Sequence, residues 1–441
     1  MEGETGNKSP IKNGSVEQPK PNYIIVKEMH ETEVVGINNE TQEEANFIHG
    51  LHIFSVVGLC ILFSTPVILI PQHDALQFPK YWYELMVTFS LTYPVQWTLL
   101  AILDNHFLLN IKRLASPKTG IVLALTPLLG FVLIYCSLYL FWTYKLGYNF
   151  PMPYACFISL LMFFPFLLTM WHLFPKEMKT KKDSRKRLTS FIWYILWAFF
   201  TNWLYNSLQI MLRKMPSVAQ PIMALVLPLM RSLDAKILKT KLNKCRITDD
   251  LVVESYACII SNVNFLLYVT ISISTLTNDI TTFCILLVDV LGNFYHCYGI
   301  IKLHRKVDFD EVQITRRQKE KDKKIKILAL SEVLEILIPL SYTVSFIVAY
   351  YGPNATILRS VKNDYWGNSV SGDIGTVLTT EVIIFSADFS SLVVSIVCLW
   401  YFCRINLLRY FCLALKKYWL LIAAVAGSLI SKVCLIFNCN T

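Results

Sequence analysis

Long apolar runs dominate this sequence, and the gaps between them are alternately rich and poor in Lys and Arg. A hydrocarbon core about 30 Å thick needs roughly 20 helical residues to cross it. Open strands leave backbone groups unsatisfied in lipid, so spans of this length are helical. The sequence therefore predicts an all-α polytopic transmembrane bundle of about 11 spans, with a range of 10 to 12. The runs lie at about 51–70, 83–103, 120–143, 152–174, 190–212, 218–232, 251–276, 280–301, 327–351, 376–401 and 418–437.

The basic residues between the runs predict an orientation. Gaps that follow even-numbered runs hold 29 Lys and Arg residues, whereas gaps that follow odd-numbered runs hold six. Basic loops are retained on the cytosolic side of a membrane. We therefore expect a cytosolic N-terminus and an extracytosolic C-terminus, with basic cytosolic loops at 175–189, 233–250 and 302–326 and an extracytosolic loop at 352–375.

Composition separates two regions of the chain. Residues 1–48 are polar and rich in Glu, Asn, Lys and Pro, which predicts a disordered acidic cytosolic tail. Residues 49–441 are expected to form a single membrane domain. Within the predicted outer loop, Asn354-Ala-Thr is an acceptor sequence for N-glycosylation, so we expect a glycoprotein modified at Asn354.

Overall composition excludes a water-soluble chain, since 54% of the residues are apolar and only 16% are charged, against about 25% charged in soluble domains. The net charge of +10 is explained by basic loops that face anionic lipid. The expected partners are therefore the lipid bilayer and its anionic lipids, not nucleic acid. No sequence feature specifies an oligomeric state, or favours the plasma membrane over an endomembrane.

Polar side chains within the run 280–301 form a stripe. Asp289, Asn293 and His296 stand at i, i+4 and i+7, so a helix places them on one face. A charged residue near the middle of a span normally faces protein or water. The stripe therefore predicts polar neighbours on adjacent spans.

Further acids lie within the later spans, where bases are scarce. Glu335, Glu381 and Asp388 are expected well inside the membrane, and Glu381 could form an ion pair with Lys432 at similar depth. Asp289, Glu335 and Asp388 have no evident basic partner in the sequence. A buried carboxyl without a base takes a proton or binds a cation, so these acids predict a polar pathway for protons or cations among the spans from 251 to 401. The alternative is that they are protonated and bond neighbouring helices for packing.

The run 218–232 is unusual because it is short and contains Pro221 and Pro228. A broken helix that lines a binding cavity is one interpretation. An ordinary kinked span is favoured over it, with Arg231 extending to the cytosolic headgroups.

Signatures of enzymes and metal sites are not found. The chain has no H-E-x-x-H, G-x-S-x-G or phosphate-binding Gly-rich sequence, and most of its 12 Cys residues fall within spans without metal-ligand spacing. Asp289 with His296 as half of a metal site is a minor alternative. We expect no catalytic residue, metal or cofactor.

Three classes of function remain open. A solute or ion transporter, or a channel, with an acidic pathway among the later spans is favoured. A receptor or scaffold whose buried polar residues serve helix packing is the second class. A lipid-modifying membrane enzyme is the third.

Overall fold

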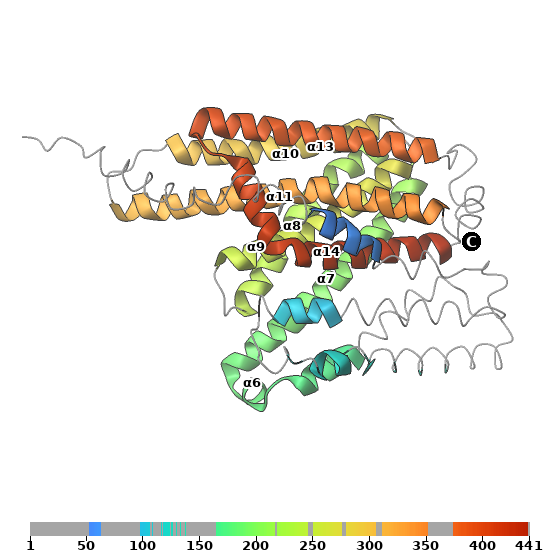
Figure 1. Cartoon of the computed structure of the whole chain (residues 1–441), viewed down its shortest axis with the longest axis vertical. Helices are drawn as coiled ribbons and strands as arrows, with labels where there is room; N and C mark the ends of the chain where they lie inside the picture. The colour runs from blue at the N-terminus through green and yellow to red at the C-terminus, as the bar shows by residue number, and fades with distance from the viewer. Residues whose placement is uncertain are drawn as a thin grey trace, which may run out of the picture. The chain divides into compact units, whose positions relative to one another are not determined.

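In a computed structural model of the chain, the described residues are 53–62, 98–105, 165–216, 218–245, 250–275, 279–305, 311–351 and 374–439, with separate positions between 108 and 137. These residues are almost entirely helical, and no strand occurs among them. Short helical segments precede the long helices: the apolar helix Ile53–Leu62 and the helical residues 98–104, 118–123 and 165–173. The later helices are α6 (Lys176–Thr180), α7 (Lys182–Lys214), α8 (Gln220–Cys245), α9 (Asp250–Thr275), α10 (Asp279–Arg305), α11 (Glu311–Tyr351), α13 (Ile374–Cys403) and α14 (Leu407–Cys439) (Figure 1).

The last helices of the chain are compatible with a membrane protein in their length and apolar composition. In the described part of the chain, five helices are long and apolar enough to cross a bilayer, at Asp250–Thr270, Ile280–Arg305, Gln313–Val348, Leu378–Cys403 and Leu407–Ile430. They overlap the last five predicted spans, although the segments Gln313–Val348 and Leu407–Ile430 begin 14 and 11 residues before the predicted runs 327–351 and 418–437. The count of about 11 spans and the orientation stay predictions, because the tail 1–48, most of the earlier runs and the loop around Asn354 lie outside the described residues.

Helix α8 is longer than the run 218–232 suggests. It begins at Gln220, which places Pro221 in the first turn, where a missing backbone N–H removes no intrahelical hydrogen bond. Pro228 lies inside the helix, and the helix continues to Cys245. Much of the segment expected as the loop 233–250 is therefore helical, and Arg231 lies near the middle of α8.

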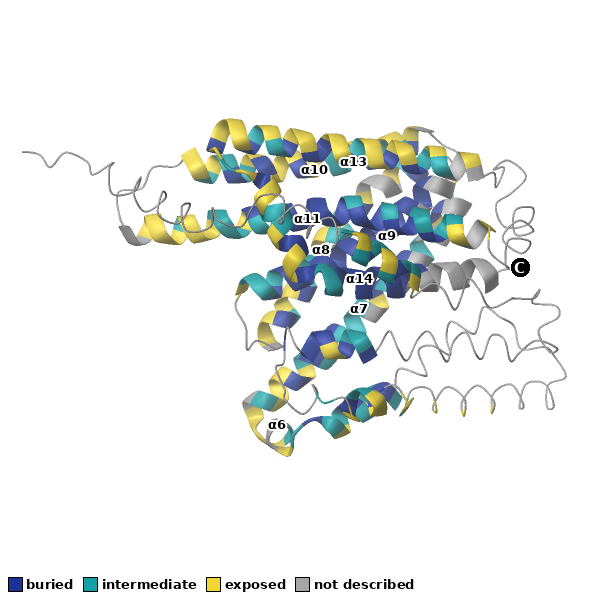
Figure 2. Ribbon diagram, viewed as in Figure 1, coloured by how far each residue is buried: buried dark blue, intermediate teal, exposed yellow. Residues whose placement is uncertain are grey.

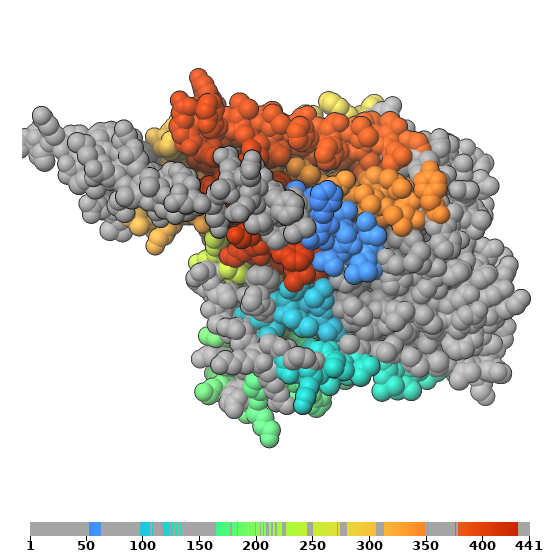
Figure 3. All heavy atoms as spheres, in the orientation of Figure 1, coloured from blue at the N-terminus to red at the C-terminus, as the bar shows by residue number. Residues whose placement is uncertain are grey.

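The helices form an inner and an outer set. Helix α9 contacts α7, α8, α11, α13 and α14, and most of its span is buried. Helices α10 and α13 pack on each other and on α11 but leave much of their apolar surface exposed (Figure 2). In the space-filling view, α13 forms a long outer face of the bundle (Figure 3). An extended apolar surface of this kind fits contact with lipid chains.

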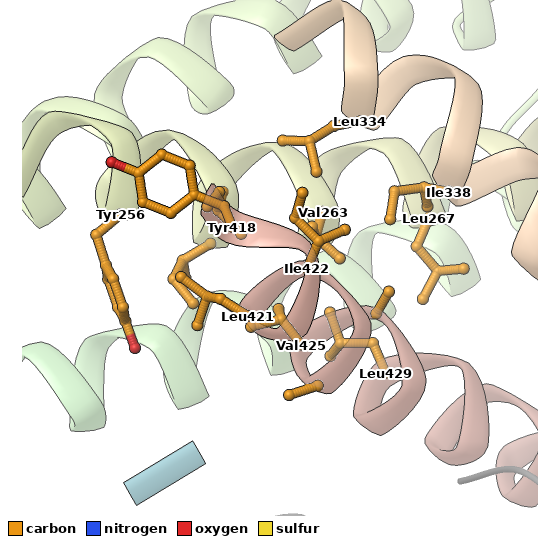
Figure 4. Close-up of a cluster of buried hydrophobic side chains, with 14 of the residues drawn as sticks. Tyr256, Val263, Leu267, Leu334, Ile338, Tyr418, Leu421, Ile422, Val425 and Leu429 are labelled. Carbon is orange, nitrogen blue, oxygen red and sulfur yellow. The ribbon is translucent and has the colours of Figure 1, made fainter. Parts of the chain in front are cut away.

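Helix α14 packs against α9 and α11 through a ridge of apolar side chains. Leu421, Val425 and Leu429 follow one another at intervals of four residues, which aligns them on one helical face. They belong to one buried cluster with Val263 and Leu267 of α9 and Leu334 and Ile338 of α11 (Figure 4). Within a bilayer such packing stabilises the fold mainly through van der Waals contact, because lipid chains are as apolar as leucine.

Basic segments from distant parts of the sequence meet at one end of this bundle. Lys239 of α8 and Lys323 of α11 both form ion pairs with Glu254 of α9, and the Lys323 Nζ to Glu254 Oε2 distance is 2.9 Å. At the same end, the Tyr410 hydroxyl of α14 donates a hydrogen bond to Asp322 of α11 over 3.2 Å. The basic parts of α8 and α11 therefore lie at the same end of the bundle.

The turn between α13 and α14 uses an arginine in a conformation that favours glycine. Arg404 has a φ of 55°, and its backbone N–H donates to the Trp400 carbonyl over 3.0 Å. This hydrogen bond closes the end of α13 in the manner of a left-handed C-terminal cap. The Arg404 guanidinium also lies over the Trp400 ring, 5.2 Å from its centroid.

A pair of substitutions at this turn tests the cost of its backbone conformation. Arg404→Gly and Arg404→Val both remove the contact with Trp400, but only valine has a branched Cβ that clashes in the left-handed region. We expect the valine variant to be less stable than the glycine variant by about 1–2 kcal/mol. The measurement is the free energy of unfolding in mixed micelles, and equal stability of the two variants would contradict the described turn.

Candidate functional site: a buried arginine and its acids

The guanidinium of Arg231 occupies the interior of the bundle and bonds to three other helices. Its Nε donates to Asn262 Oδ1 of α9 over 2.9 Å. Its Nη1 forms an ion pair with Asp289 Oδ1 of α10 at 3.0 Å. Its Nη2 donates to Ser331 Oγ over 3.0 Å and pairs with Glu335 Oε1 over 3.3 Å, both on α11. One side chain thus connects α8 to α9, α10 and α11.

Further hydrogen bonds extend this set to α13. Ser331 Oγ accepts from Asn262 Nδ2 over 3.1 Å and donates to Glu335 Oε1 over 3.1 Å, which uses the hydroxyl both ways. Asn293 Nδ2 of α10 donates to Glu335 Oε2 over 2.8 Å and to Ser391 Oγ over 3.0 Å. Both carboxylate oxygens of Glu335 are therefore bonded. We refer to these seven residues as the Arg231 network: Arg231, Asn262, Asp289, Asn293, Ser331, Glu335 and Ser391.

The surroundings of the network strengthen its charge interactions. The Glu335 side chain is 1% exposed, and those of Asp289 and Arg231 are 18% and 20% exposed. The Phe265 ring lies against the guanidinium, with Cζ 4.8 Å from the ring centroid. Attraction between opposite charges increases as water is excluded, and an aromatic face adds to the stabilisation of the cation.

Two expectations from the sequence are therefore wrong. Arg231 does not extend away from the bundle, and Asp289 and Glu335 do have a basic partner. The reason is the length of α8. The apolar run ends near Arg231, but the helix continues to Cys245, so this arginine lies within the packed region and not at a span end.

Asp388 of α13 lies close to the Arg231 network. Its side chain is buried, at 7% exposed, and it interacts electrostatically with Asp289 and Glu335. Glu332 is a second nearby acid, buried at 1% exposed, and it accepts a hydrogen bond from Ser395 Oγ over 2.9 Å. The structure thus groups four acids on three helices, of which Asp289, Glu335 and Glu332 interact with Arg231.

His296 and Glu381 form no hydrogen bond with the Arg231 network, although His296 interacts electrostatically with Arg231 and Glu381 with Asp388. The buried stripe of α10 passes through Asn293, Cys297 and Ile300, so His296 lies on the exposed side beside Tyr295. Glu381 is buried, with Thr343 nearby, and its carboxylate oxygens make no hydrogen bond within 3.5 Å to the described residues. Its ion pair with Lys432 stays a prediction, because the Lys432 side chain is not among those described.

Sequence reasoning missed two other buried acids. Asp104 accepts hydrogen bonds from the hydroxyls of Tyr194 and Tyr256, and Asp234 accepts one from Trp197 Nε1 over 2.8 Å. Asp104 directly follows the predicted end of the run 83–103, and Asp234 lies two residues after the end of the run 218–232. Both therefore resembled residues of connecting loops, and only the helical extension beyond each run places them inside.

Neither a metal site in its described part nor a known relative indicates a function for this chain. Among the described residues, no group of three or more His, Cys, Asp or Glu side chains is arranged to hold a metal ion. Comparisons with protein-family models, curated proteins and solved structures find no match to this chain.

Proposed function

We propose that this chain is a multi-pass membrane transporter in which the Arg231 network and its neighbouring acids carry protons, or a cation coupled to a solute. The observation that supports this most directly is the excess of acids over bases. Asp289 and Glu335 pair with Arg231, Glu332 interacts with the same guanidinium, and Asp388 interacts with these three acids but not with Arg231.

The excess of carboxylates over guanidinium groups favours binding of protons or cations by the carboxylates. One guanidinium offsets one carboxylate, and further ionised carboxylates in the same apolar region repel one another. Such groups reduce the repulsion by taking a proton or by binding a cation. Intramembrane acids that change their charge in this way are common constituents of proton and ion relays.

The geometry also supplies a means of coupling. Asp289 on α10 and Glu335 on α11 pair with different nitrogens of the same guanidinium. When Glu335 takes a proton, its attraction to Nη2 weakens and Arg231 pairs mainly with Asp289. Protonation thereby changes how strongly α8 is held to α11, and this is a change that an alternating-access cycle can use.

The direct test is flux through purified protein in liposomes. We expect wild-type vesicles to pass protons or cations down an imposed gradient, and Asp388→Asn to abolish that flux because the amide cannot exchange a proton. Asparagine keeps the shape of the side chain, so folding should be retained. The control is Glu320→Gln on α11, which removes an exposed acid that pairs with Lys324 over 3.3 Å and should leave flux unchanged.

A role in packing is the competing proposal, and one observation favours it. The network is well hydrogen-bonded, and both oxygens of Glu335 have donors. If the polar groups serve only to bond helices, Asp388→Asn and Asp289→Asn should both transport at the wild-type rate, and leucine at either site should destabilise the fold. Normal flux in both asparagine variants would overturn the relay.

A further inference from the structure

A cavity lies apart from the Arg231 network, between α7, α9, α14 and the helical residues near 100 and 166. Its volume is about 110 Å³. A single water molecule needs roughly 10–15 Å³ of such space, so the cavity has room for a small molecule of several non-hydrogen atoms. Its lining is mainly apolar but includes the carboxylate of Asp104 and the amide of Asn264.

Hydrogen bonds to one carboxylate oxygen hold Asp104 in place. The hydroxyls of Tyr194 and Tyr256 both donate to the same atom, Oδ1. Asp104 itself is only 6% exposed and forms no ion pair with any described residue. The tyrosines thus fix the carboxylate in place through Oδ1. Among the described residues no donor bonds Oδ2, which can accept a hydrogen bond from a molecule in the cavity.

Asn264 presents a second acceptor on the cavity wall. It is 6% exposed, and its Oδ1 atom is buried without a hydrogen-bond donor among the described residues. A buried acceptor without a donor costs about 1–3 kcal/mol, and a ligand N–H removes that cost. The polar part of the cavity therefore needs a ligand that carries both positive charge and hydrogen-bond donors.

Most of the remaining residues that line the cavity are apolar and indicate that the rest of the ligand is apolar. Ile260, Val425 and Leu429 contribute aliphatic walls, while Phe166 and Tyr194 contribute rings. Rings of this kind stabilise a nearby cation through their faces. We infer that this cavity is a binding site for a primary ammonium group attached to a short apolar chain, with Asp104 and Asn264 as its acceptors.

A primary ammonium can reach this site from two sources. It can belong to a free alkylamine or to the headgroup of an ethanolamine lipid, and both present the same N–H donors. The inference concerns binding at a second site, so it holds or fails independently of proton or cation flux through the Arg231 network.

The test is a comparison of two probes of similar size on the purified full-length chain. We expect n-butylammonium to bind saturably, and 1-butanol to bind about ten- to a hundredfold more weakly because it lacks the charge. Isothermal titration calorimetry measures both affinities. Equal affinity for the two probes, or no saturable binding of n-butylammonium, would overturn the inference.

Three variants assign the binding to the cavity. Asp104→Asn removes the charge, and Ala198→Leu fills space at the cavity wall while it leaves Asp104 intact, so both should lose n-butylammonium binding. Asp234→Asn removes a buried acid that neither lines the cavity nor belongs to the Arg231 network, so this variant should bind normally. Thermal unfolding of each variant verifies that it is folded. If both folded cavity variants keep wild-type affinity, the site lies elsewhere and the inference fails.

The lipid source is distinguished in the same experiment. In nanodiscs that contain only phosphatidylcholine, the site has no primary ammonium competitor, whereas added phosphatidylethanolamine supplies one. A lower apparent affinity for n-butylammonium in the ethanolamine lipid assigns the site to headgroups. An unchanged affinity assigns it to free amines.

Discussion

Replacement of Arg231 by glutamine should destabilise the fold by about 3–5 kcal/mol. Glutamine keeps a hydrogen-bonding group but removes the positive charge, so Asp289 and Glu335 lose their ion-pair partner in a mostly buried setting. The cost is that of leaving carboxylates unpaired, and it exceeds the net value of the ion pairs themselves. Equilibrium unfolding in mixed micelles, followed by tryptophan fluorescence, measures the change.

The design of this experiment separates charge from packing. Arg231→Gln/Asp289→Asn/Glu335→Gln removes both carboxylates together with the guanidinium, so this triple variant should recover much of the lost stability. Arg316→Gln is the matched control, because Arg316 is exposed on α11, and a change within about 0.5 kcal/mol is expected there. If Arg231→Gln is as mild as the control, the ion pairs do not contribute to the fold.

Removal of the Tyr256 side chain should have a comparable effect. Tyr256 is fully buried, lies at one edge of the α14 contact and donates to Asp104 (Figure 4). Tyr256→Phe removes only the hydrogen bond to the carboxylate, which should cost about 1.5–3 kcal/mol. Tyr256→Ala also leaves a cavity, and the total loss should reach at least about 3–5 kcal/mol.

A second tyrosine provides the control for the hydroxyl. Tyr205 is also buried, but its hydroxyl has no hydrogen-bond partner among the described residues. Tyr205→Phe should therefore be neutral or slightly stabilising, because it removes a polar atom that is desolvated without compensation. A cost for Tyr205→Phe equal to that for Tyr256→Phe would show that the contact with Asp104 adds nothing.

Periodicity and run length predict the helices well but not their ends. The last five runs correspond to α9, α10, α11, α13 and α14, because an apolar stretch of about 20 residues is a strong signal. However, a predicted apolar run ends at the first charged residues. Helices α8 and α11 extend beyond their runs into basic sequence. The position of Arg231 in the bundle depends on such an extension, so the sequence placed it at a surface.

The periodicity of the sequence also does not predict which residues of other helices pair with the acids. The face shared by Asp289 and Asn293 is predictable from a spacing of four residues. The contact between Arg231 and Glu335 joins residues 104 positions apart, and it depends on how α8 packs against α11. His296 illustrates the same limit, because its exposure depends on which stripe of α10 meets the neighbouring helices.

The length of α11 has a mechanical consequence. With 41 residues and a rise of 1.5 Å per residue, it measures about 60 Å, roughly twice the thickness of a hydrocarbon core. Ser331 and Glu335 lie on the same continuous rod as the basic segment 311–326, while Pro339 lies beyond them toward the other end. The rod is stiff on the basic side and weakened by the proline on the other. A tilt of α11 that begins at the ion pairs with Arg231 is therefore transmitted to the basic segment 311–326. A force applied to this segment likewise acts on the ion pairs.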